Sequence, residues 1–306
     1  MTDVSVVMAV FNGAPSVSQT VESLLAQQDC LFEIVVVDDG SSDGTAAILD
    51  AFAARDSRVR VIHQDNTGLT RALARGCAAA RGEFIARQDC GDTSMPGRLA
   101  QQSGLLAANP GVVMTACATR FLAPGGEALF VHASPGDALH AGLAVLDERA
   151  VKGPPHHGGT MFRRAAYERC GGYRAPFVVA QDIDLWLRLA ELGRCVGTQE
   201  VGYVAAMSAD SISARRRSEQ LRMQAAAVRA ARLRRAGKPD AMVLEALARA
   251  TRERSRGSAR LARARFLYFV ASCLRKTDPA AARRYYWDSF REHPLMVKSL
   301  LRMGGW

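Results

Sequence analysis

The chain has 306 residues, 48% of them hydrophobic, which is enough to bury one large core or two smaller ones. It contains no long uncharged apolar run and begins without a basic segment followed by an apolar one, so we expect neither a membrane-spanning helix nor a secretory signal. The 7 cysteines are scattered and form no C-x-x-C pair, which argues against a zinc site or a disulfide framework and indicates a reducing cytoplasm.

The net charge of +10 is unevenly distributed. From Ala205 onward the sequence contains 23 Lys and Arg but only 8 Asp and Glu, whereas the first 204 residues contain 17 basic and 22 acidic residues. A mildly acidic body therefore carries a strongly basic C-terminal part. Such asymmetry indicates an anionic partner for that part, for example a membrane surface, nucleic acid or another protein.

The N-terminal part alternates buried strands with amphipathic helices. The pattern predicts strands at 4–10, 32–37, 59–63 and 83–87, and helices at 17–27, 44–54 and 69–80. Repeated strand–helix–strand units of this length predict a parallel sheet with right-handed crossovers. Ligands of such sheets bind at the carboxyl ends of the strands, so the polar clusters after Val10, Val37 and Arg87 mark the expected site.

The pattern becomes less regular after this alternation. We predict a helix at 96–109, a strand at 112–118, a hairpin turn at 124–126, an apolar stretch at 160–162, an amphipathic helix at 183–192 and a late strand at 195–204. After Ser213 the sequence reads as helical throughout, with breaks near 237–239, 257–258, 278–279 and 293–294. We therefore divide the chain into a body, residues 1–213, and a basic helical extension, residues 214–306.

Three acidic motifs follow predicted strands or precede a helix. Asp38 and Asp39 end the second strand, Asp89 and Asp92 follow the fourth, and Asp182 precedes the helix at 183–192. Such carboxylates can accept hydrogen bonds from a base or ribose, hold Mg²⁺ or Mn²⁺, or act as a general base. Each motif taken alone also fits a turn or a helix cap, because these sites favour the same residue types.

The order and spacing of the motifs resemble those of family 2 glycosyltransferases of the GT-A fold, over roughly residues 3–213. The landmarks are A-V-F-N-G at 9–13, V-D-D-G-S-S-D-G-T at 37–45, N-T-G-L at 66–69, R-G-E-F-I-A-R at 81–87, P-G-R-L at 96–99, H-H at 156–157, M-F-R-R at 161–164, G-G-Y at 171–173 and Q-D at 181–182. The resemblance implies an α/β fold: a Rossmann-like, mostly parallel sheet flanked by helices, here followed by an all-helical C-terminal extension.

The resemblance also implies an activity and residue roles. The enzyme would transfer a sugar from a nucleoside-diphosphate donor to a saccharide or lipid-linked acceptor in an inverting reaction, as in polysaccharide synthesis. Asp182 would be the base. Donor-binding roles would fall to Val10, Asn12, Asp38, Asp39, Asp89, His157 and Arg163.

The acidic loop departs from the family pattern. It usually reads D-x-D-D, with the second carboxylate as a metal ligand, and here that position is Gly91. Three interpretations stay open: Asp89 and Asp92 hold Mg²⁺ or Mn²⁺ with water filling the gap, the enzyme binds metal weakly and uses Arg and His, or the protein is inactive. We favour the first two together, because Asp39, Asp89 and Asp182 all remain.

The basic extension allows further interpretations. Helical Arg residues with apolar spacing can lie on an anionic bilayer, which would place a cytoplasmic enzyme at the inner face of the membrane. Equally, they can form a solvated face packed on the body. We do not expect nucleic-acid binding, since no reading motif is present. Alternative functions are a non-catalytic sugar-nucleotide-binding scaffold on the same fold and a membrane-docking adaptor acting through this extension.

Overall fold

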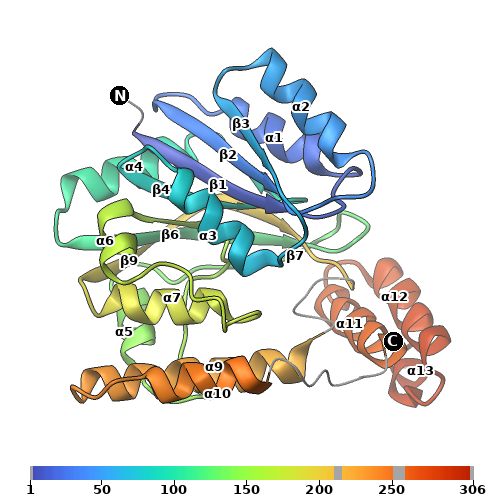
Figure 1. The fold of residues 1–306 in the computed structure, drawn as a ribbon. Coiled ribbons are helices and arrows are strands. Elements are labelled where there is room, and N and C mark those ends of the chain that lie inside the picture. The colour runs from blue at the N-terminus through green and yellow to red at the C-terminus, as the bar shows by residue number, and fades with distance from the viewer. Residues whose placement is uncertain (1–2, 210–215, 251–258, 304–306) are drawn as a thin grey trace.

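The computed structural model describes residues 3–209, 216–250 and 259–303 (Figure 1). The strands are β1 (Val4–Val10), β2 (Phe32–Asp38), β3 (Val59–His63), β4 (Phe84–Asp89), β5 (Thr93–Ser94), β6 (Val112–Leu122), β7 (Ala128–His132), β8 (Thr160–Arg163) and β9 (Arg194–Ala206). The helices are α1 (Val17–Leu25), α2 (Thr45–Arg55), α3 (Leu69–Ala79), α4 (Arg98–Ala108), α5 (Ala138–Ala144), α6 (Arg164–Arg169), α7 (Gln181–Ala190), α9 (Arg217–Arg235), α10 (Ala241–Ala250), α11 (Ala259–Leu274), α12 (Pro279–Glu292) and α13 (Val297–Met303).

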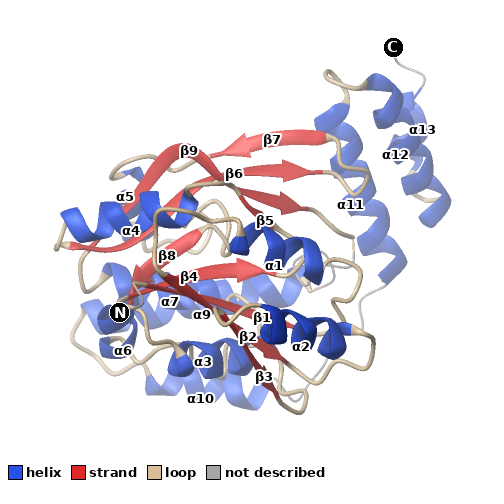
Figure 2. Ribbon diagram, turned by 90° about the horizontal axis from the view of Figure 1, so that it is seen from above, coloured by secondary structure: helices blue, strands red, loops and turns tan. Residues whose placement is uncertain are grey.

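The strands form one sheet in the order β3-β2-β1-β4-β8-β6-β9-β5, and β7 pairs with β6 (Figure 2). β1 is parallel to β2 and β4, β2 is parallel to β3, and β6 is parallel to β9. Only β8, β5 and β7 run against their neighbours in the described sheet. The predicted fold class, a mostly parallel sheet flanked by helices with a helical C-terminal part, is confirmed.

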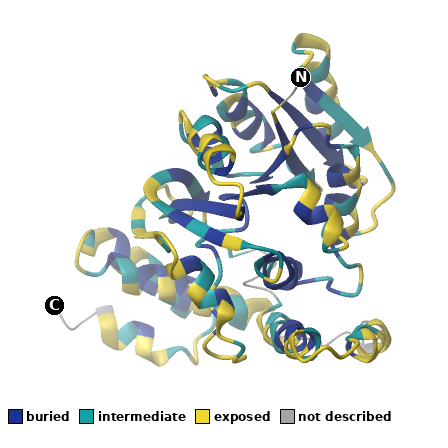
Figure 3. Cartoon of the chain, turned by 90° about the vertical axis from the view of Figure 1, so that its left-hand side faces the viewer, coloured by how far each residue is buried: buried dark blue, intermediate teal, exposed yellow. Residues whose placement is uncertain are grey.

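Helices cover both faces of the sheet, and each face has its own core. The even-numbered apolar residues of β1 join a core with α1, α2 and α4, whereas Val7 joins the core that contains α3 and α7. Successive residues of a strand point to opposite faces, so β1 is apolar on both faces apart from Ser5. Figure 3 shows the central strands as buried, with the exposed residues on the outer faces of the helices.

The predicted elements of residues 4–109 are all present, with ends shifted by a few residues. β6 extends to Leu122 instead of ending at residue 118, because it pairs with β7 across the predicted hairpin turn. The elements β5, β7, α5 and α6 were not predicted. They are short, and short segments carry too little periodicity to be recognised.

The C-terminal part is helical in its described segments, as predicted, while the break at 257–258 lies outside the described residues. Met223 and neighbouring alanines of α9 share one core with Leu185 of α7, and α11 and α12 pack on Ala123 in the β6–β7 turn. The division at residues 213 and 214 stays a prediction. No helix in the described ranges combines the length and the apolar character needed to cross a bilayer.

Candidate active site

The site is built at the carboxyl ends of three adjacent parallel strands. Val10 is the cross-strand partner of Asp38, and Ala9 is the partner of Asp89. The carbonyl of Val10 also accepts a hydrogen bond from the amide of Asp39 at 2.8 Å. Residues that the sequence placed at three separate strand ends therefore meet at one edge of the sheet, where ligands of such sheets bind.

Asn12 joins the loop after β1 to the loop after β2. Its side-chain oxygen accepts from the amide of Ser42 at 2.8 Å, and its own amide donates to Ser41 Oγ at 2.9 Å. The amide of Gly13 donates to Thr45 Oγ1 at 2.9 Å. Asn12 has φ +54°, a left-handed conformation that asparagine tolerates better than most residues. The two loops therefore form one continuous rim.

Asp39 holds a third loop against this rim. Its carboxylate accepts from the amides of Thr67 and Gly68, both at 2.8 Å, and from Gln64 Nε2 at 2.7 Å. The residue is only 3% exposed. Its carboxylate therefore binds the loop at 64–68 and fixes the position of this loop beside the rim.

Asp38, next to Asp39, belongs to a row of hydrogen-bonded groups that also includes His63 and Asp50. Asp38 accepts from the amide of Ser41 at 3.1 Å and pairs with His63 Nδ1 at 3.0 Å, while His63 Nε2 contacts Asp50 at 3.0 Å. Hydrogen bonds to Asp50 and Asp38 raise the pKa of His63 above its usual value. Asp38 therefore fixes the turn that follows β2.

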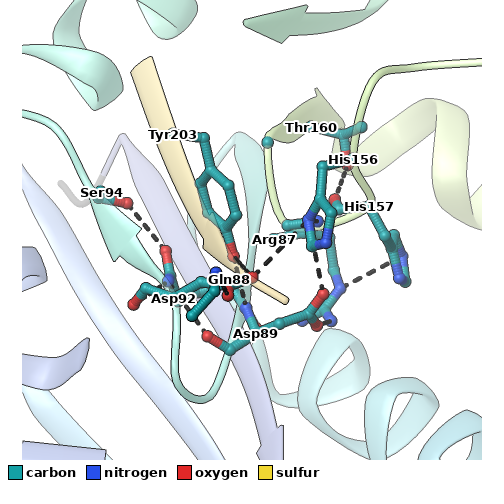
Figure 4. Close-up of polar contacts among 12 residues, drawn as sticks. Arg87, Gln88, Asp89, Asp92, Ser94, His156, His157, Thr160 and Tyr203 are labelled. Atoms are coloured by element: carbon teal, nitrogen blue, oxygen red, sulfur yellow. Dashed lines mark hydrogen bonds and ion pairs between the residues drawn. The ribbon is translucent and has the colours of Figure 1, made fainter. Parts of the chain in front are cut away.

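Asp89, Asp92 and His156 form a candidate metal site (Figure 4). One ligand atom from each residue lies within 4.8 Å of the others, and His156 Nδ1 is 3.9 Å from Asp89 Oδ2 and 3.8 Å from Asp92 Oδ2. Two carboxylates and one imidazole suit a divalent cation such as Mn²⁺. His156 is not among the site residues predicted from the sequence, because the H-H pair alone does not tell which ring faces the carboxylates.

Arg87 fixes the first of these ligands. Its guanidinium is fully buried and donates to Asp89 Oδ1 at 2.6 Å. Burial is the largest single effect and opposes ionisation of Asp89, but Arg87, His157 and His156 together outweigh it, so the pKa of Asp89 is lowered. Asp89 is therefore held as a carboxylate, the form that binds metal.

Asp92 is held by Tyr203 and by the last residue of β9. Its carboxylate accepts from Tyr203 Oη and from the amide of Ala206, each at 3.0 Å. Burial and the nearby Asp89 charge raise the pKa of Asp92 to about 7. A buried carboxylate beside a second one favours either a proton or a cation between them.

His157, predicted to contact the donor, lies in the protein interior instead of facing Asp89 and Asp92. Its Nε2 accepts from Arg87 Nε at 3.3 Å and lies 2.7 Å from Tyr173 Oη, and its ring meets the edge of Trp186. Burial and Arg87 lower the pKa of His157 to about 3, so the ring is neutral. In this structure His157 positions Arg87 by accepting a hydrogen bond from its guanidinium.

Asp182 is the second residue of α7, and its carboxylate is close enough to Asp89 and Arg87 to interact with their charges. Ala180, two residues earlier, has φ +54°, and Asp182 Oδ1 accepts from the amide of Ile183 at 2.8 Å. Burial raises the pKa of Asp182 to about 6, and the charge of Asp89 adds to the effect. A carboxylate with this pKa is ionised at neutral pH and is still basic enough to accept a proton.

Arg163, also predicted to contact the donor, is not brought to this site. It pairs with Phe84, the first residue of β4, whereas Asp89 is the last. Its guanidinium donates to the carbonyl of Val112 at 2.9 Å and pairs with Glu83 at 3.2 Å. The M-F-R-R motif does not indicate the direction of the strand that contains it. Because β8 runs antiparallel to β4, Arg163 lies at the end of the sheet opposite to Asp89.

Gly91 has a conformational role in the acidic loop. Its φ is +96°, where L side chains rarely occur, and its amide donates to Thr20 Oγ1 at 2.9 Å. A Cβ atom there would lie 3.5 Å from Ser16 Oγ. The loop thus brings Asp89 and Asp92 to one cation-sized space without a carboxylate between them.

The sequence is similar to a known family and to several known proteins. The sequence model described as "Glycosyl transferase family 2" matches residues 5–171. "Putative glycosyltransferase EpsE" of Bacillus subtilis (strain 168) is 33% identical over 220 residues, which cover 69% of this chain and 76% of EpsE. "Putative teichuronic acid biosynthesis glycosyltransferase TuaG" of the same organism is 27% identical over 193 residues, 62% of this chain and 73% of TuaG.

Two solved structures share the fold at low sequence identity. TarS 1-349 of S. aureus has a TM-score of 0.58 and 15% identity, covering 99% of this chain and 89% of its own. The mannosyltransferase PcManGT of Pyrobaculum calidifontis, in complex with GDP-Man and Mn²⁺, has a TM-score of 0.55 and 22% identity, covering 98% of this chain and 83% of its own. The chain therefore belongs to glycosyl transferase family 2 and is a glycosyltransferase of the GT-A fold.

Proposed function

We propose that this glycosyltransferase moves a sugar from a nucleoside-diphosphate donor to an acceptor hydroxyl with inversion at the anomeric carbon. The observation that carries the proposal is the cluster of Asp89, Asp92 and His156 beside Asp182, at the carboxyl ends of parallel strands. The joined loops at 11–14 and 38–45 offer backbone amides and polar side chains for the nucleotide half of the donor. UDP and GDP-Man are bound by TarS and PcManGT, respectively, which supports a donor of this class.

The donor set of the cluster fits a divalent cation. Asp89 is ionised through Arg87, Asp92 has a raised pKa that a cation would offset, and His156 contributes nitrogen. We propose Mn²⁺ or Mg²⁺, with Mn²⁺ favoured by the imidazole ligand. When bound, the cation would neutralise charge on the diphosphate leaving group.

The protein's own groups would carry out the transfer step in the following way. Asp182, ionised above about pH 6, accepts the proton of the acceptor hydroxyl. The acceptor oxygen bonds to the anomeric carbon from the side opposite the diphosphate, whose bond to that carbon breaks with both electrons leaving on the phosphate oxygen. Val10, Asn12 and Asp38 hold the rim on which the nucleotide lies, and Asp39 holds the loop 64–68 beside it.

A donor screen tests this proposal. We would measure the melting temperature with UDP- and GDP-sugars, with and without Mn²⁺, because a ligand that binds the folded state raises it. We expect one nucleotide sugar to raise the melting temperature in a Mn²⁺-dependent manner, and Asp89→Asn to reduce that shift. A shift that is equal with and without Mn²⁺ would contradict the cation role. No shift with any nucleotide sugar would contradict the donor class.

We propose a saccharide or lipid-linked saccharide as the acceptor. The names of the relatives TuaG and "Succinoglycan biosynthesis protein ExoO" of Rhizobium meliloti (strain 1021) point to polysaccharide synthesis. ExoO is 45% identical over 98 residues, which cover 32% of this chain and 28% of ExoO. The reaction would take place on the cytoplasmic side of the membrane.

Two arginines at the C-terminal end of α9 bind other parts of the chain, while Arg222 and Arg229 of the same helix are exposed. Arg232 donates to the carbonyl of Leu146 at 2.6 Å, and Arg234 pairs with Glu191 at 2.7 Å and with Asp240 at 2.7 Å. The apolar side of α9 is buried against the body. These contacts favour the second interpretation of the basic sequence, a face packed on the body, while Arg215 and the Arg residues of 251–258 lie outside the described residues.

We propose that a peripheral contact with an anionic bilayer is made by residues 295–302, which include most of α13. Leu295, Val297 and Leu301 are 85%, 52% and 74% exposed, with Lys298 and Arg302 on the same short segment. Apolar side chains next to cations suit a negatively charged lipid surface. Binding to phosphatidylglycerol vesicles should fall in a Leu295→Glu, Leu301→Glu variant and stay unchanged in Leu31→Glu, which alters a 63% exposed leucine far along the chain. Equal binding of all three proteins would exclude this contact.

A further inference from the structure

A line of aromatic rings leads from the candidate metal site to the C-terminal helices. The ring of His156 stacks on Tyr203 at 5.2 Å and meets the edge of Phe121 at 5.9 Å. Phe121 stacks on Phe130 at 4.8 Å, and Phe130 meets the edge of Phe269 at 6.3 Å. Rings from β9, the loop before β8, β6, β7 and α11 thus form one continuous row.

The fold explains how these distant residues meet. Phe121 and Phe130 are direct cross-strand partners in the β6–β7 hairpin, so their side chains lie on the same face. α11 packs on the turn of this hairpin through Phe266 and Val270, which are buried with Ala123. Phe269, one turn after Phe266 on α11, reaches Phe130 on strand β7.

The outer half of the row is exposed. Phe130 and Phe269 are 38% and 43% exposed. Phe266, one turn away on α11, is 9% exposed and already joins the helix to the hairpin. The packing of α11 therefore does not require Phe269 at the surface. Exposed aromatic side chains that continue a row of rings from the candidate metal site are typical of a ligand site.

We propose that Phe121, Phe130 and Phe269, the aromatic platform, bind the acceptor saccharide and direct its hydroxyl toward Asp182; this rests on the proposed function. The negative faces of aromatic rings attract the polarised C–H groups on one side of a sugar ring. Exposed His132 and Arg265 flank the rings and can bond hydroxyl groups. A lipid chain would need an apolar groove, which these polar neighbours do not favour. The C-terminal helices are thus part of the acceptor site.

The experiment compares acceptors of different length. Transfer is measured to methyl glycosides of glucose, galactose, mannose and N-acetylglucosamine, and to a trisaccharide and an n-octyl glycoside of each. The variants are Phe130→Ala and Phe269→Ala, with Phe130→Tyr as the conservative change. Trp287→Ala is the matched control, because Trp287 is 48% exposed on the neighbouring helix α12. Melting temperatures check that every variant is folded.

We expect the wild-type enzyme to use one trisaccharide with a higher kcat/KM than its methyl glycoside. Phe130→Ala and Phe269→Ala should each lower this ratio by about two- to tenfold, the size of one aromatic contact, whereas Phe130→Tyr and Trp287→Ala should keep it. The proposal is overturned if no trisaccharide is preferred, if the Ala variants keep the ratio, or if only the octyl preference falls. Hydrolysis of the donor without acceptor, measured on the unaltered enzyme, reports the proposed function separately.

Discussion

Arg87 and Asp89 lie two residues apart on β4, and the fully buried guanidinium of Arg87 donates to the Asp89 carboxylate at 2.6 Å. The same guanidinium donates to the carbonyl of Val7 on β1 and to the ring of His157. One side chain thus joins two strands to the histidine loop and keeps a candidate metal ligand ionised.

Replacement of Arg87 tests this relationship. Arg87→Met leaves the Asp89 carboxylate, two backbone carbonyls and the His157 ring without their buried donor, so we expect the free energy of unfolding to fall by about 3–5 kcal/mol. Arg87→Lys keeps the charge but cannot reach all partners, so its loss should be smaller. Urea denaturation measures both, with Arg71→Met on the exposed side of α3 as the control. If Arg87→Met is as stable as this control, the hydrogen bonds of Arg87 do not contribute to the stability of the fold.

Asp182 should be required for transfer but not for donor binding. Asp182→Asn keeps the shape of the side chain and removes its basicity, so kcat should fall about 10²- to 10⁴-fold. The donor-induced shift in melting temperature should persist, because the base acts on the acceptor. A variant that retains kcat would show that another group accepts the proton.

The raised pKa of Asp182 has two consequences for pH dependence. The base is active only when ionised, so kcat/KM should fall as the pH drops through about 6, and not only near the usual value of 3.8. Burial disfavours the ionised form in the folded state, so Asp182 lowers stability above about pH 6 relative to pH 3.8. The stability of Asp182→Asn relative to wild type should therefore increase between these pH values, as measured by urea denaturation. A flat difference would mean that the pKa of Asp182 is ordinary.

The fold was predictable from the sequence because its central elements are long and regular. The apolar runs of β1 and β2 and the helical spacing of α1 and α3 are local patterns, and local patterns determine these elements. The parallel order followed from their alternation. The short strand β7 was not predictable, since its pairing with β6 depends on contacts across a turn and on α11, which lies far away in the sequence.

The site was predictable only as far as strand ends determine it. Asp38 and Asp89 lie at strand ends, so their approach follows from the parallel topology. His156, His157 and Arg163 lie in or beside a loop and an antiparallel strand, where a shift of one residue reverses the direction of a side chain. Sequence alone could therefore not tell that His156 faces the carboxylates while His157 faces the core.

His156 should contribute to cation binding. His156→Ala removes the nitrogen ligand, so the affinity for Mn²⁺ in the presence of UDP should fall about 10- to 100-fold, as for other changes close to a metal. Isothermal titration of Mn²⁺ measures this, and His140→Ala on α5 serves as the control, because His140 lies outside the cluster. Unchanged Mn²⁺ affinity in His156→Ala would leave Asp89 and Asp92 as the proposed ligands without it.

The backbone conformation of the acidic loop should require glycine at position 91. At φ +96° a side chain is strained whatever space surrounds it, so Gly91→Ala should lower the free energy of unfolding by about 1–2 kcal/mol. Gly91→Asp should be destabilised as well, although it restores the acidic residue usual in the family. Urea denaturation of both variants is compared with Gly104→Ala, a helical glycine with nothing within 4 Å of the added Cβ. A Gly91→Ala protein as stable as wild type would show that the loop does not need this conformation.

Two truncations distinguish the parts of the C-terminal region. A chain that ends at residue 213 lacks α9, whose Met223 and Val228 are buried in the core that contains α7, so it should expose apolar surface and aggregate or unfold at a lower temperature. A chain that ends at residue 250 keeps α9 and α10, with the ion pairs of Asp240 to Arg174 and Arg234. It should fold and bind the donor, but lose the preference for longer saccharides together with Phe269. Thermal denaturation and donor binding measure the first difference, and a stable 1–213 chain would mean that the body folds without α9.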